Sequence, residues 1–179
     1  VFAREHIELI KRTVHSPVKE SEGLKIYKQF DTTHRYQIGI DCAEGTEMSE
    51  ENIRKDTKDS AVIKIWDHTA HEEVAHWSAK VAPRVTAEKA VHFAKLYENP
   101  MMVPEMNSMG LALIDKLDEV GYSNVFRRKE YDKVMKKTLK KVGWRTTSST
   151  KQLLIAHFEE LMRKKEPQIR TATTVEQFK

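Results

Sequence analysis

The stretch that most constrains the fold of this chain is residues 36–45, with the sequence YQIGIDCAEG. A nearly continuous apolar run, typical of a strand covered on both faces of its sheet, ends there on Asp41 and is followed by small residues. Burying a carboxylate costs several kcal/mol unless a cation or hydrogen-bond donors compensate its charge. Asp41 is therefore the first candidate for a metal ligand.

A second apolar run, residues 101–104, leads to Glu105, and a helix is predicted to begin at Ser108. Taken alone, Glu105 would be a carboxylate favoured by the dipole of that helix. Two nearby carboxylates repel each other, and a divalent ion removes the conflict, so the pairing with Asp41 predicts one shared cation site. Asp59, before another predicted strand, is either a supporting group of this site or an ordinary strand-start aspartate.

Carboxylate oxygens suit Mg²⁺, which keeps several waters and so leaves room for a substrate phosphate. With two ions roughly 4 Å apart, one activates a water and the other stabilises the leaving oxygen of a phosphodiester. In such a site we expect Asp41 to bridge both ions and Glu105 to hold one of them.

With 179 residues and 39% hydrophobic content, the chain can bury one ordinary core. Its single cysteine, Cys42, leaves no internal disulfide and favours a reducing compartment. No apolar run approaches the roughly 18 residues that span a bilayer, so we expect a soluble, intracellular protein with no membrane partner. Because the chain begins at Val1 and not at a methionine, we also expect a piece of a longer polypeptide.

The apolar pattern predicts a polar N-terminal arm that ends in a leading strand, residues 24–30, followed by alternating elements. The predicted core strands are residues 36–41, 60–67, 73–81, 101–105 and 124–126. The predicted helices are residues 86–98, capped by Thr86, residues 108–120, ended by Gly121, and a last helix to residue 165, capped by Ser149 or Thr150.

This order of elements predicts an α/β ribonuclease H-like fold, a five-stranded mixed sheet in the order 3-2-1-4-5 with helices on both faces. A right-handed crossover would lay residues 101–105 beside residues 36–41 and parallel to them. Asp41 and Glu105 would then be neighbours.

Positive charge is concentrated near the C-terminal end, although the net charge is only +4. Residues 127–165 contain thirteen Lys or Arg and four Asp or Glu. This segregation predicts a polyanionic partner, the alternative being a solvated, lysine-rich helix face. The candidates for contacts to DNA phosphates are Arg127, Arg128, Lys136, Lys137, Lys140, Lys141, Arg145 and Lys151.

Four segments, taken in order, resemble the nuclease domain of the large terminase subunit of tailed bacteriophages. They are residues 36–45, DSAVIKIWD at 59–67, VPEMNSMGLALIDKL at 103–117 and GWRTTSSTKQLLI at 143–155. The resemblance implies a Mg²⁺- or Mn²⁺-dependent endonuclease that cuts concatemeric double-stranded viral DNA during genome packaging. By position, Asp41 matches the metal-binding aspartate of the first strand and Glu105 matches the acidic ligand of the fourth.

The resemblance also implies a domain organisation and partners. Residues 1–33 would be an arm that follows an N-terminal packaging ATPase of the same polypeptide, and residues 34–179 the nuclease domain without its C-terminal end. The expected partners are double-stranded DNA, that ATPase domain, the terminase small subunit and the portal, on the packaging motor in the host cytoplasm.

In one respect the chain departs from the family pattern. The third metal-binding aspartate of the family, near the C-terminus of the domain, has no match, since the last aspartate is Asp132. We therefore expect this fragment to be a weak nuclease. The alternatives within the fold are a Holliday-junction resolvase, a ribonuclease H, and a non-catalytic DNA-binding or motor-docking module.

Overall fold

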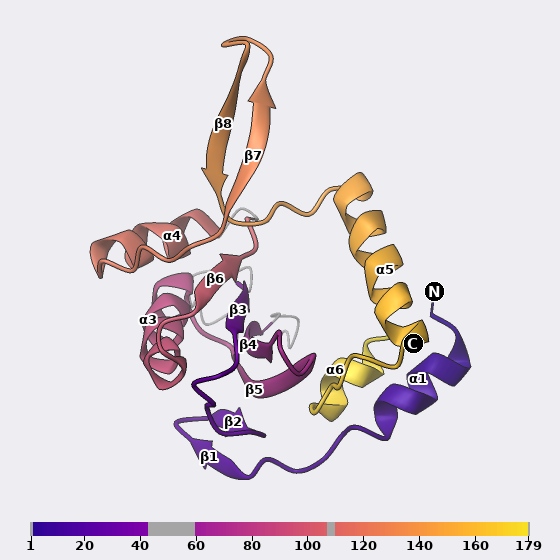
Figure 1. Ribbon diagram of the computed structural model, residues 1–179. Helices are drawn as coiled ribbons and strands as arrows, with labels where there is room; N and C mark the ends of the chain where they lie inside the picture. Colours follow the sequence, from indigo (N-terminus) through magenta and orange to yellow (C-terminus); the bar gives the residue numbers. More distant parts are fainter. Residues whose placement is uncertain (1, 43–59, 107–109, 179) are drawn as a thin grey trace, which may run out of the picture. The chain divides into compact units, whose positions relative to one another are not determined.

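The computed structural model describes residues 2–42, 60–106 and 110–178 (Figure 1). Its strands are β1 (Lys19–Ser21), β2 (Leu24–Ile26), β3 (Tyr36–Asp41), β4 (Ala61–Asp67), β5 (Glu72–Ala79), β6 (Met101–Pro104), β7 (Arg127–Asp132) and β8 (Lys137–Val142). Its helices are α1 (Arg4–Lys11), α3 (Pro83–Ala94), the short 3-10 helix η1 (Lys95–Tyr97), α4 (Gly110–Glu119), α5 (Ser148–Arg163) and α6 (Ala172–Glu176). Among these described helices, none has the length and apolarity to cross a membrane.

Strands β1 to β6 form one sheet in the order β1-β2-β5-β4-β3-β6. With residues 36–41 (β3) counted as the first predicted core strand, the run β5-β4-β3-β6 is the predicted order 3-2-1-4. The predicted fold class is confirmed. The fifth predicted strand is present only as a parallel bridge between Val125 and Met102 of β6. The predicted count of five strands was wrong because β1 and β2 extend the sheet beyond β5.

The leading strand is shorter than residues 24–30, since β2 ends at Ile26. The next two backbone N–H groups, those of Tyr27 and Lys28, both donate to the carbonyl of Val74, at 2.8 and 3.3 Å. A regular ladder gives each N–H its own acceptor, so this shared acceptor marks the point where pairing with β5 stops.

Contacts between Cα atoms divide the chain into two compact units. The first comprises Val1–Gln37, Lys64–Trp77 and Thr147–Lys179, and the second comprises Ile38–Ile63 and Ser78–Thr146. Strands β3, β4 and β5 have residues in both. The predicted boundary between residues 1–33 and 34–179 stays a prediction.

In the first unit, α1, α5 and α6 share an apolar cluster. Its buried members are Ile7, Ile10, Met162, Ile169 and Val175. The rings of Phe2, Phe158 and Phe178 pack against this cluster, with centroids 5.2 to 5.6 Å apart. Edge-to-face and tilted ring pairs of this kind add to the area that they bury, so they hold the three helices together.

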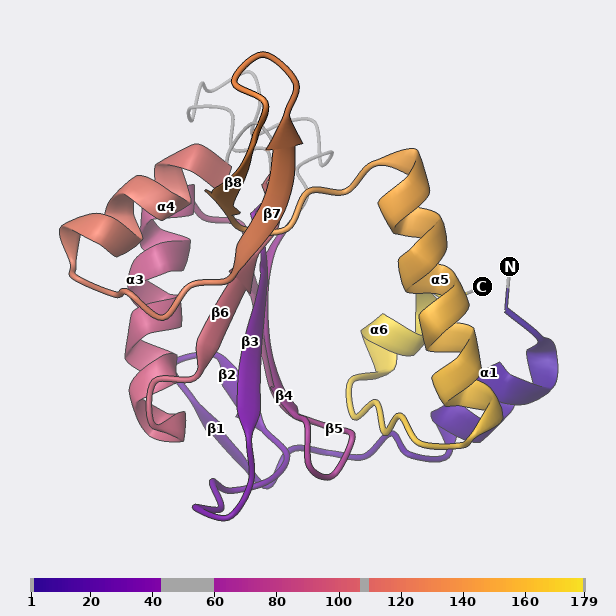
Figure 2. The ribbon, with the colours of Figure 1, turned by 45° about the horizontal axis from the view of Figure 1, so that its top comes forward.

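In the second unit, α3 and α4 pack side by side on one face of the sheet (Figure 2). Helix α3 begins at Pro83 and not at the predicted Thr86 cap. Proline suits a first helical position because its missing N–H would have no partner there. Thr86 lies one turn further on, buried, and its hydroxyl donates to the carbonyl of Ala82 at 3.2 Å.

Gly121 terminates helix α4, as predicted. This glycine has φ +74°, and the N–H of Tyr122 donates to the carbonyl of Leu117 at 2.9 Å, the bond that closes a left-handed helix terminus. The predicted start of this helix, Ser108, lies outside the described residues.

Residues 127–142, which show no clear periodicity in the sequence, form the antiparallel hairpin β7–β8. Figure 1 shows the hairpin extending beyond the end of β6. Side chains along β7 alternate between exposed and half-buried. The hairpin therefore has two distinct faces.

Candidate functional site

The two candidate metal ligands lie at neighbouring strand ends in the second unit. Asp41 is the last residue of β3, and Glu105 directly follows β6. The two strands run in the same direction (Figure 1), and the N–H of Glu105 donates to the carbonyl of Ile40 at 2.8 Å. The structure thus brings the backbones of the two acidic residues together, as the crossover argument predicted.

Strand β3 fixes the direction of its last side chain. Ile38 and Ile40 are buried, at 0% and 3% exposure, whereas Gly39 and Asp41 are exposed. Alternation along a strand therefore places Asp41 on the same side of β3 as Gly39, away from the buried isoleucines. Since Asp41 is exposed, the cost of burying a charge does not by itself call for a cation, and the argument for one depends on the proximity of Glu105.

Cys42, next to Asp41, is buried. Burial, together with the neighbouring charge of Asp41, raises the pKa of its thiol to about 12. The thiol therefore stays protonated at neutral pH, which makes it a poor nucleophile and a poor metal ligand. Cys42 is therefore a packing residue of the core.

Glu105 is held from its other side by a short segment that the sequence analysis did not assign to the site. Trp144 forms a parallel bridge with Glu105. Its N–H donates to the carbonyl of Pro104 at 2.8 Å, and its carbonyl accepts from the N–H of Met106 at 2.6 Å. The backbone at Glu105 is therefore fixed between β3 and the chain that leaves the hairpin.

The indole of Trp144 packs as part of this support. Its ring lies 6.5 Å from that of Phe126, and its Nε1 is buried without a hydrogen-bond partner in the described part of the chain. Stacking on a nucleic acid base needs an accessible ring face, so the half-buried Trp144 is better suited to packing.

The donor set fits a hard divalent cation, because Asp41 and Glu105 offer only carboxylate oxygens. In residues 2–42, 60–106 and 110–178, no group of three or more His, Cys, Asp or Glu side chains is placed to share a metal ion. The proposed supporting residue Asp59 lies outside these ranges. The described residues thus supply no third carboxylate to this pair.

The basic candidates are divided between the two units. Those of the second unit lie on the hairpin or just after it: Arg127, Arg128, Lys136, Lys137, Lys140, Lys141 and Arg145. Lys151 is exposed in the first turn of α5, in the first unit. Arg128 also supports the backbone, because its guanidinium donates to the carbonyls of Val142 and Gly143, at 2.8 and 3.0 Å. It therefore anchors the base of the hairpin.

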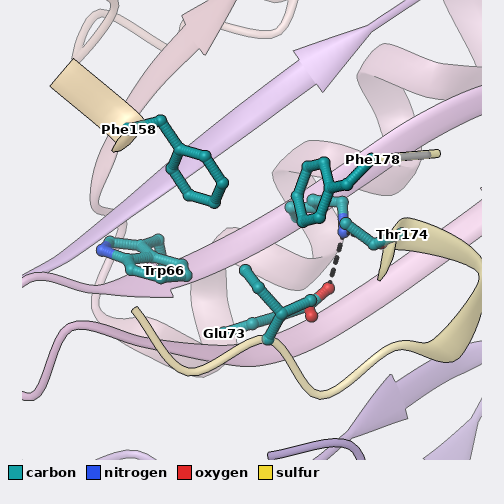
Figure 3. Close-up of a pocket in the computed structure, with 7 residues that line it drawn as sticks. Trp66, Glu73, Phe158, Thr174 and Phe178 are labelled. Carbon is teal, nitrogen blue, oxygen red and sulfur yellow. Dashed lines mark hydrogen bonds and ion pairs between the residues drawn. The ribbon is translucent and has the colours of Figure 1, made fainter. Parts of the chain in front are cut away.

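The first unit contains a cavity of about 150 Å³ (Figure 3). The rings of Trp66, Phe158 and Phe178 surround it, and Lys64 and Glu73 line it with their charges already paired at 2.8 Å. Glu73 also accepts hydrogen bonds from residues 170 and 171. The two charged groups that line this cavity are therefore satisfied from within the protein.

Comparisons with known proteins support the fold. Protein-family models and curated protein sequences give no match to the chain. Among solved structures, the large terminase nuclease of the thermophilic phage G20c with bound magnesium superposes with a TM-score of 0.64, at 15% identity, over 94% of this chain and 74% of that one. The large terminase nuclease domain of Thermus phage P74-26 gives 0.59 and 15%, over 94% and 73%.

A eukaryotic virus supplies a third example. The human cytomegalovirus terminase nuclease domain, soaked with manganese and bound to an inhibitor, has a TM-score of 0.52 at 11% identity, over 96% of this chain and 77% of that one. The chain therefore has the fold of the terminase nuclease domains, similar in shape where little sequence identity remains.

Proposed function

We propose that this chain is a divalent-metal-dependent DNA endonuclease that cuts concatemeric double-stranded viral DNA during genome packaging. The observation that carries the proposal is the hydrogen bond from the N–H of Glu105 to the carbonyl of Ile40, because it joins the backbones at the two strand ends where the acidic residues stand. The fold shared with the terminase nucleases of phages and of cytomegalovirus supports it.

Asp41 and Glu105 would together hold the Mg²⁺ or Mn²⁺ ions of a two-ion site. Bound there, the ions would lower the pKa of an attacking water and neutralise charge on the leaving oxygen. The protein would contribute fixed geometry: β3 sets the direction of Asp41, and the pairing of Glu105 with both Ile40 and Trp144 limits its movement. Asp59 keeps its proposed supporting role.

The partners follow from the same proposal. Double-stranded DNA would bind the basic surface around the hairpin through its phosphates. The ATPase domain of the same polypeptide, the terminase small subunit and the portal would complete a packaging motor in the host cytoplasm. Residues 1–33 would link the ATPase domain to the nuclease domain at residues 34–179.

The proposal is tested by exchanging the two acidic residues conservatively. Asp41→Asn and Glu105→Gln should each lower Mn²⁺-dependent cleavage of a linear duplex by roughly 100-fold or more, because each removes an anionic ligand of the ions. Affinity for the same duplex, measured by fluorescence anisotropy with EDTA, should stay within about twofold. Asp118→Asn, an exposed carboxylate on α4, is the matched control.

Cleavage by Asp41→Asn at the rate of the unchanged protein would remove the proposed site. Four-way junctions and RNA–DNA hybrids, used as parallel substrates, separate a resolvase or ribonuclease H from a duplex-cutting enzyme.

A non-catalytic DNA-binding or motor-docking module is the second candidate. It is favoured by the lack of a third carboxylate among the described residues. Calorimetric titration with Mn²⁺ distinguishes the two functions. Heat of binding that disappears in Asp41→Asn supports the nuclease, whereas DNA binding without any uptake of Mn²⁺ supports the module.

A further inference from the structure

The register of the hairpin sorts its charged residues onto two faces. Directly opposite residues of an antiparallel pair lie on the same face, and alternate residues lie on opposite faces. One face, here called the bridged face, carries residues 128, 130 and 132 of β7 with 141, 139 and 137 of β8. The other, the open face, carries residues 127, 129 and 131 with 142, 140 and 138.

On the bridged face, a carboxylate compensates a pair of opposed cations. Arg128 stands directly opposite Lys141. Between them, Glu130 accepts from Lys141 at 2.9 Å through Oε1 and from Arg128 at 3.3 Å through Oε2. The hydrogen bond from Lys141 and the charge of Lys141, followed by the charge of Arg128, lower the pKa of Glu130 against the opposing effect of burial. One of the two positive charges of this pair is therefore compensated within the hairpin.

On the open face, the same kind of pair has no such compensation. Lys129 stands directly opposite Lys140, and Arg127 lies two residues before Lys129 on the same face. The open face contains no acidic residue, and in the described part of the chain none of these three cations forms an ion pair. Like charges directly opposite each other destabilise a strand pair, so an external anion would relieve this repulsion.

We infer that the hairpin contacts duplex DNA with its open face, through Arg127, Lys129 and Lys140 to the phosphates, while the bridged face serves the hairpin itself. The inference rests on the proposed function only in taking DNA as the polyanion. A two-stranded ribbon is narrow enough to lie along a groove of B-DNA. Tyr131, 61% exposed on the same face, and Thr138 opposite it add hydroxyl groups that can donate to phosphate oxygens.

This inference refines the candidates from the sequence. It adds Lys129, which was not among them, and it removes Arg128, Lys137 and Lys141, which lie on the bridged face together with Glu130 and Asp132. A count of positive charges cannot make this distinction, because both faces carry three cations and differ only in their acids.

The test compares two double variants that remove the same charge. Lys129→Gln with Lys140→Gln should weaken binding of a 30-base-pair duplex at least about tenfold near 0.1 M salt, and the slope of log K against log salt should fall by about 2. Lys137→Gln with Lys141→Gln, on the bridged face, should change affinity by less than about threefold. Binding is measured by fluorescence anisotropy with EDTA, so that cleavage plays no part.

Urea unfolding provides an independent measurement. The open-face variant should be as stable as the unchanged protein or more stable, because it loses the repulsion between Lys129 and Lys140, whereas the bridged-face variant loses a partner of Glu130. Equal losses of DNA affinity in the two variants would overturn the inference, as would no loss in either, and both results leave the proposed nuclease intact. Failure of the unchanged protein to bind duplex DNA would overturn both.

Discussion

At the scale of single residues, Gly143 meets two separate demands. Its φ of +74° lies in the left-handed region, and a Cβ placed there would approach Cγ of Met106 to 2.5 Å and the carbonyl oxygen of Pro104 to 2.8 Å. The next residue, Trp144, pairs with Glu105. A side chain at this position would therefore push the chain away from the candidate metal site.

We predict that Gly143→Ala lowers the free energy of unfolding by about 2 to 4 kcal/mol, because it adds a steric clash to the cost of a left-handed alanine. Gly121→Ala is the matched control, since Gly121 has the same φ but no atom within 4 Å of the position that a Cβ would take, and it should cost only about 1 kcal/mol. Urea unfolding of both variants measures the difference. Equal losses would show that the close approach at Gly143 is unimportant.

A residue of the site could be predicted from the sequence when the residues that fix its position lie near it in the chain. Asp41 and Glu105 were identified because each directly follows its own apolar run, and their proximity follows from a single crossover. Trp144 was missed as a support of Glu105 because its role depends on pairing with a strand some forty residues earlier. The only local signal is the Gly143–Trp144 pair, which is typical of a turn.

At the scale of secondary structure elements, α5 shows how a helix start can be displaced from its prediction. The cap is Thr147 and not Ser149 or Thr150. Its hydroxyl accepts from the N–H of Thr150 at 3.2 Å, and the hydroxyl of Thr150 accepts from the N–H of Thr147 at 2.7 Å. Several hydroxyl residues stand in a row, and sequence alone does not determine which of them uses its side chain in this reciprocal way.

We predict that Thr147→Ala lowers the free energy of unfolding by about 1 kcal/mol, because an N–H of the first turn loses its acceptor. Ser148→Ala removes a neighbouring hydroxyl that is not the cap and should change stability by less than about 0.5 kcal/mol. Chemical denaturation followed by circular dichroism measures both. If Ser148→Ala were the more damaging substitution, the helix would begin elsewhere in solution.

The elements differ in how well their sequences specify them. Strands β3, β4 and β6 were predicted within a residue or two because their apolar side chains are buried in the sheet. The β7–β8 hairpin was missed because neither of its strands has an apolar face. Its two strands are joined by backbone pairing, by the contacts of Glu130 and by Asp132, which accepts from the N–H groups of Val134 and Met135 at 2.9 Å. Hydrophobic periodicity cannot detect this kind of stabilisation.

At the scale of the whole molecule, a buried histidine in β5 couples stability to pH. His76 is 8% exposed, and its Nδ1 has no hydrogen-bond partner in the described part of the chain. Burial, and then the charge of Lys64, lowers the pKa of His76 to about 4, although Glu73 acts in the opposite direction. The folded protein therefore keeps this imidazole neutral well below the pH at which an unfolded chain would protonate it.

The sign of the effect follows from proton binding in the two states. A histidine in the unfolded chain titrates near 6.5, so between that pH and about 4 the unfolded state binds a proton that the folded state does not, and stability falls as the pH falls. The contribution of His76 is complete above pH 6.5. Between pH 7 and pH 5 we expect a loss of about 2 kcal/mol from this residue.

We predict that His76→Gln removes most of this pH dependence. Urea unfolding of the variant at pH 7 and at pH 5 should give free energies that differ much less than those of the unchanged protein. A residual slope of the same sign should remain, because burial also lowers the pKa of His68. His157→Gln, which replaces an exposed histidine on α5, is the control and should retain the full dependence. If both variants kept the slope of the unchanged protein, acid sensitivity in this range would have to come from groups other than the buried imidazole of β5.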